Sequence, residues 1–368
     1  MENIDLKSLS LELKVGQLFF IGVPGPTIDE VTARLLDRVH PGGVCLFARN
    51  IREAQQTRDL LDGITDHVGS RPFLCLDQEG GLVDRLRRLI TPMPAPNRLP
   101  NRETAAEFGR VVAEVVRRLG FNMDFAPVVD VVDELRSRTT NGLFSRTFGS
   151  TPGDVASFAE AFIGSLESGG CVGCLKHFPG LGASEVDSHE ELPLVNISED
   201  ELYSVDLAPY KHLLTDSVVH AVMVAHAAYP NVDLQERDQN GKLLPSSLSV
   251  NFVTGLLRQQ LAFDGLVITD DLEMGAIVRN YGIGEACKLA IKAGVDVLAI
   301  CAGVESINEG YDAVLEGVRS EHIPESRIDQ SLDRIARTKQ LLHEPLPFDA
   351  RRLEELSAAI ADLNNRLN

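Results

Sequence analysis

The strongest constraint on the fold is a repeating pattern: a short apolar run followed by a segment of helix length. The runs lie at 17–22, 43–47, 73–77, 121–125, 172–176, 221–225, 266–270 and 297–301. Continuous apolar runs of this length are typical of strands buried on both faces of a parallel sheet. Segments between them, such as 104–119 and 154–168, carry apolar residues at helical spacing. The pattern predicts an α/β fold, a (β/α)8 TIM-like barrel.

A doubly wound open sheet is the alternative, but no glycine-rich dinucleotide fingerprint follows the first run. The repeating pattern stops near residue 340. A proline-rich bend follows at 344–349, and 350–367 has the pattern of a terminal helix. We expect a single barrel over residues 1–343, with 344–368 forming a linker and a helix packed on the barrel.

Composition narrows the class of partner. The formal net charge is −19 at pH 7, with 44% hydrophobic and 24% charged residues, as expected of a globular protein. Nucleic acid and anionic membranes would repel this charge, so neither is expected as a partner. The sequence shows neither a secretory h-region nor a membrane-length apolar stretch. We therefore expect a cytoplasmic protein. We also expect a monomer, because no exposed apolar patch can be read from the sequence.

The 6 cysteines lie mostly in apolar runs, as reduced core cysteines do. Cys171 and Cys174 have the C-x-x-C spacing of a redox or zinc site, but no second pair accompanies them. We expect core packing, with no metal and no cofactor.

Ionisable side chains gather where the predicted strands end. These are Asp77 at the third strand, Lys176 and His177 at the fifth, His226 after the sixth and Asp270 at the seventh. Barrel enzymes build their active sites at the carboxyl ends of the strands. Independent strands that bring charged groups to one rim indicate a functional site there.

Retaining glycosidases need a carboxylate nucleophile and a proton donor on opposite sides of the sugar. Asp270, held at the end of a strand, fits the nucleophile; Asp271 is the alternative, although it could instead cap the next helix. His189 can donate and accept a proton near neutral pH. Asp187 precedes it in the same loop and could accept the ring N–H, fixing the tautomer.

The lysine at the end of the fifth strand needs a partner, because an unpaired buried charge is costly. Asp77 and sugar hydroxyls are both reasonable partners for Lys176. Arg85 could reach back to the site or form a surface salt bridge, and the sequence leaves both open. Asp130 lies beyond the fourth strand in an apolar run with a proline, which favours a structural role.

Several stretches carry a family resemblance, and they run in order along the chain: Lys14-Val-Gly-Gln-Leu18, Gly42-Gly-Val-Cys-Leu-Phe-Ala-Arg-Asn50, Asp77-Gln-Glu-Gly-Gly81, Phe125-Ala-Pro-Val-Val-Asp130, Ser145-Arg-Thr-Phe-Gly149, Lys176-His-Phe-Pro-Gly180, Asp187-Ser-His189 and Thr269-Asp-Asp-Leu-Glu-Met274. Together they resemble glycoside hydrolase family 3, and within it the single-domain β-N-acetylglucosaminidases of peptidoglycan recycling.

The resemblance implies a role for each matching residue. Asp270 would be the nucleophile, His189 the acid/base and Asp187 its partner. The residues implied to hold N-acetylglucosamine are Asp77, Arg85, Arg146, Lys176 and His177. The implied activity is a retaining exo-β-N-acetylglucosaminidase, which removes terminal N-acetylglucosamine from peptidoglycan-derived fragments such as muropeptides or disaccharides.

The chain also departs from the family pattern. Leu82 replaces a usual Arg, and Leu181 and Ala183 replace the His and Asp of Pro-Gly-His-Gly-Asp. The last two lie in the loop of the expected acid/base. Two alternatives follow. One is an N-acetylglucosaminide phosphorylase, because a histidine repels phosphate less than a carboxylate would. The other is a catalytically weak protein that binds amino sugars or muropeptides.

Overall fold

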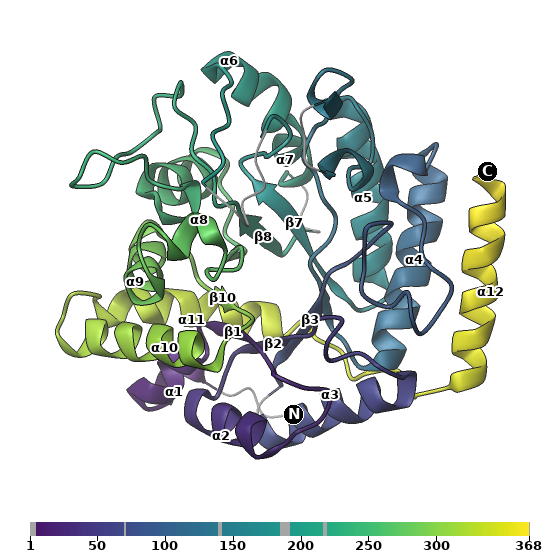
Figure 1. The fold of residues 1–368 in the computed structure, drawn as a ribbon, viewed down its shortest axis with the longest axis horizontal. Helices are drawn as coiled ribbons and strands as arrows, with labels where there is room; N and C mark the ends of the chain where they lie inside the picture. The colour runs from purple at the N-terminus through teal and green to yellow at the C-terminus, as the bar shows by residue number, and fades with distance from the viewer. Residues whose placement is uncertain (1–4, 70, 139–141, 185–191, 216–218, 368) are drawn as a thin grey trace.

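A computed structural model describes residues 5–69, 71–138, 142–184, 192–215 and 219–367 of the chain. Figure 1 shows strands at the centre of the molecule with helices around them. The strands of the main sheet are β1 (Phe19–Gly22), β2 (Gly43–Cys45), β3 (Phe73–Leu76), β6 (Met123–Asp124), β7 (Val172–Phe178), β8 (Ala221–Val224), β9 (Leu266–Thr269) and β10 (Leu298–Ile300).

The main sheet is parallel and runs in the order β10-β1-β2-β3-β6-β7-β8-β9. A parallel bridge between Ile268 and Val297 joins β9 to the segment entering β10, which closes the sheet into a barrel. The predicted (β/α)8 barrel is confirmed, and each observed strand overlaps its predicted run. The fifth strand is longer than predicted, because Phe178 still pairs with Val224 of β8.

Helices surround the barrel (Figure 1). They are α1 (Leu11–Gly16), α2 (Glu30–Val39), α3 (Ala54–Val68), α4 (Arg102–Leu119), α5 (Pro152–Ser168), α6 (Glu199–Glu201), α7 (Ala208–Leu213), α8 (Gly275–Val278), α9 (Ile283–Ala293), α10 (Val304–Arg319), α11 (Glu325–Lys339) and α12 (Ala350–Arg366). Local sequence explains where they begin. At α4, for example, the Asn101 side chain accepts a hydrogen bond from the backbone N–H of Thr104, at 2.9 Å.

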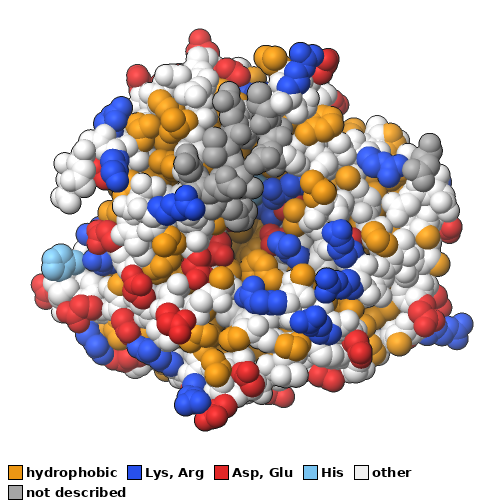
Figure 2. Space-filling model, viewed as in Figure 1, with side chains coloured by type: hydrophobic (Ala, Val, Ile, Leu, Met, Phe, Trp, Pro, Cys, Tyr) orange, Lys and Arg blue, Asp and Glu red, His pale blue; other side chains and the backbone are white. Residues whose placement is uncertain are grey.

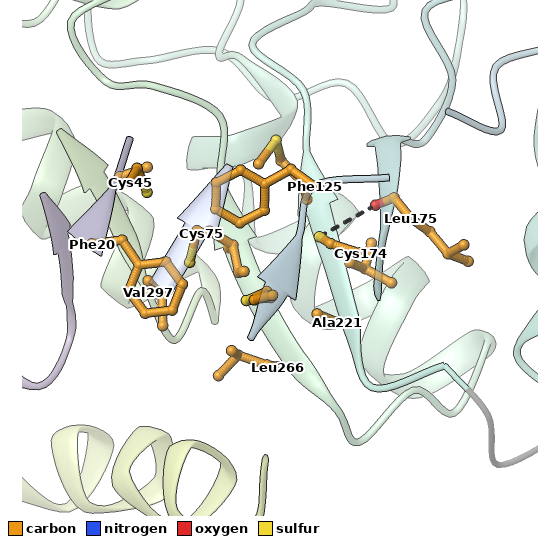
Figure 3. Close-up of a cluster of buried hydrophobic side chains, with 14 of the residues drawn as sticks. Phe20, Cys45, Cys75, Phe125, Cys174, Leu175, Ala221, Leu266 and Val297 are labelled. Atoms are coloured by element: carbon orange, nitrogen blue, oxygen red, sulfur yellow. Dashed lines mark hydrogen bonds between the residues drawn. The ribbon is translucent and has the colours of Figure 1, made fainter. Parts of the chain in front are cut away.

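Apolar side chains pack the barrel interior, as Figure 3 shows for Phe20, Cys75 and Phe125. The rings of Phe20 and Phe125 stack with their centroids 6.5 Å apart. All 6 cysteines are buried and free. Burial raises the pKa of the Cys171 and Cys174 thiols, which keeps them protonated. The expected core packing of this pair is confirmed.

The C-terminal helix α12 runs alongside α4 (Figure 1). Arg352 reaches both carboxylate oxygens of Glu114 on α4, each at 2.8 Å. Apolar residues of α12 such as Leu356 and Ile360 are buried. A helical tail is therefore confirmed, whereas the division of the chain at residue 343 stays a prediction. Among the described residues, no helix is both long and apolar enough to cross a membrane.

The partly buried carboxyl group of Glu167, at the end of α5, makes stability depend on pH. Burial raises the pKa of Glu167 from 4.5 to about 8, against one hydrogen bond from Gly173 N at 2.9 Å. Between these values the folded state binds a proton that the unfolded state releases, so stability falls as pH rises. The nearby imidazole of His220 does not compensate, because burial lowers its pKa.

We expect Glu167→Gln to be more stable than the wild type by on the order of 2 kcal/mol at pH 8.5, and to lose this advantage near pH 5. Urea unfolding at both pH values measures the difference. Glu160→Gln, on the same helix but paired with Arg102, is the control and should show no such trend. A wild-type curve parallel to that of Glu167→Gln would contradict the prediction.

Candidate active site

The described candidate residues lie where the strands end at one rim of the barrel. Asp77 directly follows β3, Lys176 and His177 belong to β7, and Asp270 directly follows β9. Arg146 follows the short turn η4 (Leu143–Ser145). Figure 2 shows a hollow near the centre of the face that it draws, with Lys and Arg side chains gathered along one side.

Charged side chains at this rim form one network. Lys176, whose side chain is 2% exposed, donates to Asp77 Oδ1 at 2.7 Å and lies 2.5 Å from Glu79 Oε1. Arg146 donates to both oxygens of Glu79, at 2.7 and 2.9 Å. Asp77 is thus the partner predicted for Lys176.

The network holds its carboxyl groups ionised. Burial alone would raise the pKa of Glu79, but the charges of Arg146 and Lys176 outweigh it and lower the pKa to about 2. Likewise, Lys176 and Arg85 hold the pKa of Asp77 well below its usual range despite burial. Ionised carboxylates beside cationic donors can form charge-assisted hydrogen bonds to the hydroxyl groups of a sugar.

Glu79 is a part of this network that the sequence analysis did not single out. It lies in a short hairpin formed by β4 (Gln78–Gly80) and β5 (Val83–Asp84). The hairpin is tied to the barrel, because Asp124 Oδ1 accepts a hydrogen bond from Gln78 N at 2.8 Å. The available signal was a second acidic residue shortly after Asp77, and sequence alone did not show that the hairpin would turn it toward Lys176.

The two alternatives for Arg85 are resolved by its contacts. Its Nη2 lies 3.1 Å from Asp77 Oδ2, so the side chain reaches back to the site. Its guanidinium carbon also lies 5.4 Å from the centre of the Phe47 ring, a favourable cation–π distance. Arg85 and Lys176 therefore contact the same carboxylate, that of Asp77.

His177 is held by Asp130, which the sequence analysis treated as structural. The Nδ1 atom of His177 lies 2.8 Å from Asp130 Oδ2, and Asp130 Oδ1 accepts a hydrogen bond from Leu181 N at 2.6 Å. Because an ionised carboxylate only accepts hydrogen bonds, His177 donates from Nδ1 to Asp130, which fixes the orientation of the ring. The structural role of Asp130 is to orient His177 and the backbone after β7.

Asp270 and its rival Asp271 have different surroundings. Asp270 N donates to Val224 O of β8 at 3.1 Å, and Asp270 Oδ1 accepts from Asp271 N at 2.8 Å. Among the described residues, no hydrogen bond engages Asp270 Oδ2. Asp271 Oδ1 instead accepts from Glu273 N and Cys301 N, at 3.0 and 3.3 Å. Burial raises the pKa of Asp271 to about 7.

Oδ1 of Asp271 is therefore engaged by two backbone N–H groups. It does not cap α8 itself, since the N-cap of that helix is Met274. Instead it stabilises the turn between β9 and α8. Each carboxylate thus has one oxygen, Oδ1, engaged by backbone N–H groups, and among the described residues no hydrogen bond engages either Oδ2, so the choice of Asp270 as nucleophile stays a prediction.

His226 forms a hydrogen bond with the backbone of the segment that follows β9. It is buried, with Nδ1 2.7 Å from Ser247 Oγ and Nε2 3.1 Å from the backbone oxygen of Asp271. Burial lowers the pKa of its imidazole, so the ring is neutral, donating from Nε2 to the carbonyl and accepting at Nδ1 from the serine. Sequence analysis placed His226 at the rim but did not identify this role.

The predicted acid/base His189 and its partner Asp187 lie outside the described residues. The flanks of their segment are described. Ser184 and Val195 form an antiparallel bridge, and Val195 N donates to Ala228 O at 2.8 Å. The described residues on the two sides of this segment, Ser184 and Val195, therefore lie next to each other.

A parallel (β/α)8 barrel whose rim combines a strand-end carboxylate with a fixed network of carboxylates and cations has the architecture of a barrel enzyme, and its groups suit a substrate rich in hydroxyl groups. The comparisons with known proteins specify the family. Residues 10–338 match the glycosyl hydrolase family 3 N-terminal domain. The chain belongs to glycosyl hydrolase family 3 and is a glycoside hydrolase.

Similar proteins cover most of the chain. It is 37% identical over 290 residues to a β-hexosaminidase of Pseudomonas aeruginosa, covering 76% of this chain and 81% of that protein. It is 32% identical to the structure of a family 3 β-N-acetylglucosaminidase from a Paenibacillus species, with a TM-score of 0.86 over 96% of this chain and 69% of that one. A β-N-acetylhexosaminidase from Beutenbergia cavernae is 27% identical, with a TM-score of 0.79 over 90% and 99% of the two chains.

Proposed function

We propose that this glycoside hydrolase is a retaining exo-β-N-acetylglucosaminidase that removes terminal N-acetylglucosamine from peptidoglycan-derived fragments. The observation that carries the proposal is the position of Asp270, at the same barrel rim as the network of Asp77, Glu79, Arg146 and Lys176. Relatives described as β-hexosaminidases and β-N-acetylglucosaminidases support the choice of sugar.

In the first step Asp270 attacks the anomeric carbon through Oδ2, because its Oδ1 accepts the hydrogen bond from Asp271 N. His189 donates a proton to the leaving oxygen while Asp187 accepts its other ring N–H. In the second step His189 takes a proton from water, which displaces Asp270 and restores the anomeric configuration. Asp77, Arg85, Arg146, Lys176 and His177 hold the sugar through its hydroxyl and acetamido groups.

A general acid matters most for poor leaving groups, and this sets the test of the proposal. We expect His189→Ala to lower kcat/KM for a β-1,4-linked N-acetylglucosamine disaccharide by about 10²–10³, the usual contribution of acid catalysis. The loss with a dinitrophenyl β-N-acetylglucosaminide should be less than about tenfold, because this leaving group departs without a proton. Initial rates on both substrates measure the ratio.

Product analysis provides the companion control. Hydrolysis with retention releases β-N-acetylglucosamine first, which NMR distinguishes from the α-anomer. The appearance of N-acetylglucosamine 1-phosphate in phosphate buffer would instead identify a phosphorylase. If His189→Ala lost kcat/KM equally on the two substrates, His189 would not be the general acid.

The cytoplasmic location and the monomeric state expected from the sequence belong to the same proposal. Sedimentation of the purified chain at micromolar concentration tests the second of these. A mass near 40.1 kDa is the expected result.

A further inference from the structure

A group of arginines adjoins the charge network of the candidate site. Stretch 49–52 follows β2, and stretch 85–88 follows the hairpin of β4 and β5. Together they contain what we call the arginine patch: Arg49, Arg52, Arg85, Arg87 and Arg88. The Phe47 ring brings the two stretches together, because the guanidinium carbons of Arg49 and Arg85 lie 5.0 and 5.4 Å from its centre. Since Arg85 also contacts Asp77, the patch lies beside the proposed sugar site.

Four of these arginines have no ion-pair partner among the described residues. Arg49 donates to the backbone oxygens of two residues and not to a carboxylate. Arg52, Arg87 and Arg88 are exposed, and in the described part of the chain their side chains form neither a hydrogen bond nor an ion pair. The chain holds 54 acidic and 35 basic residues, so a shortage of carboxylates does not explain these unpaired cations.

The acidic residues that adjoin the two stretches in sequence do not neutralise the patch. Asp84 is buried and already engaged, because its Oδ1 accepts from Gln78 Nε2 and its Oδ2 from Met93 N, each at 2.8 Å. Glu53 is exposed and forms no ion pair among the described residues. With Asp77, three carboxylates stand against five arginines, so the local charge is +2 in a chain of net charge −19. Figure 2 likewise shows Lys and Arg side chains gathered along one side of the hollow.

Local stability does not explain the unpaired arginines either. Arg52 directly precedes Glu53, the N-cap of α3, where the helix dipole disfavours a cation. Arg87 and Arg88 are adjacent like charges, which repel each other. They lie in a turn held by backbone hydrogen bonds to Leu86 O, so the turn does not depend on their side chains. A ligand outside the protein chain is the remaining partner for these charges.

The chemistry of arginine defines that ligand. A guanidinium presents a planar fork of donors that matches a carboxylate, and such charge-assisted hydrogen bonds are stronger than those to neutral hydroxyl groups. An exo-acting enzyme encloses the terminal sugar, while the remainder of the substrate extends past the rim. A neutral chitin fragment has no use for unpaired cations there, whereas a substrate that carries a sugar acid does.

We propose that the arginine patch binds a carboxylate on the part of the substrate that extends beyond the terminal N-acetylglucosamine. Arg49, Arg52, Arg87 and Arg88 supply the charge, and the substrate class is a disaccharide or longer fragment whose next unit is a sugar acid. The inference rests on the proposed function, because it presupposes that the terminal sugar occupies the neighbouring network. It adds a preference for anionic over neutral aglycones.

Three disaccharides with the same terminal sugar and linkage test the preference. They are N-acetylglucosaminyl-β-1,4-N-acetylmuramic acid, its methyl ester and the neutral disaccharide of N-acetylglucosamine. We expect wild-type kcat/KM to be about tenfold higher for the acid than for its ester, the scale of attraction by a few exposed charges. In about 0.5 M NaCl this ratio should fall below about threefold, because salt screens exposed charges.

The double variant Arg87→Gln/Arg88→Gln assigns the preference to the patch. We expect its kcat/KM to fall about tenfold for the acid and less than about twofold for the neutral disaccharide, since both side chains are exposed and engage no described residue. Arg110→Gln/Lys292→Gln is the matched control, because it removes two exposed positive charges from α4 and α9. Its ratio between the two substrates should equal that of the wild type.

Binding separates this inference from the proposed function. The Asp270→Asn variant lacks the proposed nucleophile, so calorimetry gives its Kd for each disaccharide without turnover. The acid should bind about tenfold more tightly than its ester, and adding Arg87→Gln/Arg88→Gln should abolish the difference.

Two results would overturn the inference: an acid-to-ester ratio near one in the wild type, or equal losses on the acid and the neutral disaccharide in Arg87→Gln/Arg88→Gln. If the wild type hydrolyses none of the three disaccharides but binding still depends on the carboxylate, the proposed function fails and the anion site stands. Hydrolysis of all three at rates independent of the carboxylate would leave the proposed function intact and remove the anion site.

Discussion

Asp270→Asn is expected to lower kcat by a factor on the order of 10⁴ or more, the scale lost when a covalent nucleophile is removed. The amide has almost the same shape, so its side-chain oxygen can still accept the hydrogen bond from Asp271 N. Stability should change by less than about 1 kcal/mol, because the position is at the rim and its backbone bond to Val224 O is kept. Hydrolysis of a nitrophenyl β-N-acetylglucosaminide measures the loss.

Asp271→Asn is the matched control for this prediction. Asp271 is adjacent, and its asparagine variant can accept the same hydrogen bonds from Glu273 N and Cys301 N. We expect it to keep activity within about tenfold of the wild type, as a change outside the reacting groups should. The reverse result, with an inactive Asp271→Asn and an active Asp270→Asn, would show that Asp271 is the nucleophile.

Lys176→Met is expected to reduce both activity and stability. Lys176 lies between Asp77 and Glu79, and its removal leaves the partly buried Asp77 and the buried Glu79 with Arg85 and Arg146 as their cationic partners among the described residues. Removing one partner of a buried ionic group costs about 3 kcal/mol or more. We expect kcat/KM to fall about 10²-fold or more, because the carboxylates that we propose hold the sugar lose the charge that keeps them ionised and in place.

The stability loss of Lys176→Met should depend on pH with a definite sign. In the wild type the pKa of Glu79 is lowered from 4.5 to about 2, so its stabilising contribution is complete above pH 4.5 and disappears as the pH falls toward 2. The variant lacks much of this contribution. The difference in unfolding free energy between the two proteins should therefore be largest near pH 7 and smaller near pH 3.5.

Urea unfolding at the two pH values measures this difference. Lys292→Met, on the exposed side of α9, serves as the control for loss of a lysine charge and should change stability by no more than about 0.5 kcal/mol at either pH. A Lys176→Met protein with normal kcat/KM would show that the network does not support the sugar site.

Much of the site could be predicted because strand ends are visible in the sequence. Asp77 and Lys176 are 99 residues apart, yet each ends a predicted apolar run, and parallel strands bring such ends to one rim. The partnership of Glu79 with Arg146 could not be predicted in this way. Glu79 turns inward only because a short hairpin, tied to Asp124, reverses the chain after β3. Neither residue belongs to a strand of the barrel.

The sequence alone determined the barrel and the strand ends, because strands buried on both faces appear in the sequence as continuous apolar runs. The choice of Asp270 over Asp271 stays a prediction. Tertiary structure alone decided which charges meet. Only the structure shows that Arg85 contacts Asp77 and that Asp130 contacts His177. It also shows that Asp271 accepts hydrogen bonds from backbone N–H groups, and that Arg136 forms a buried ion pair with Asp206. The physical reason is that an ion pair depends on side chains meeting within a few ångströms, and loops of irregular conformation determine those distances.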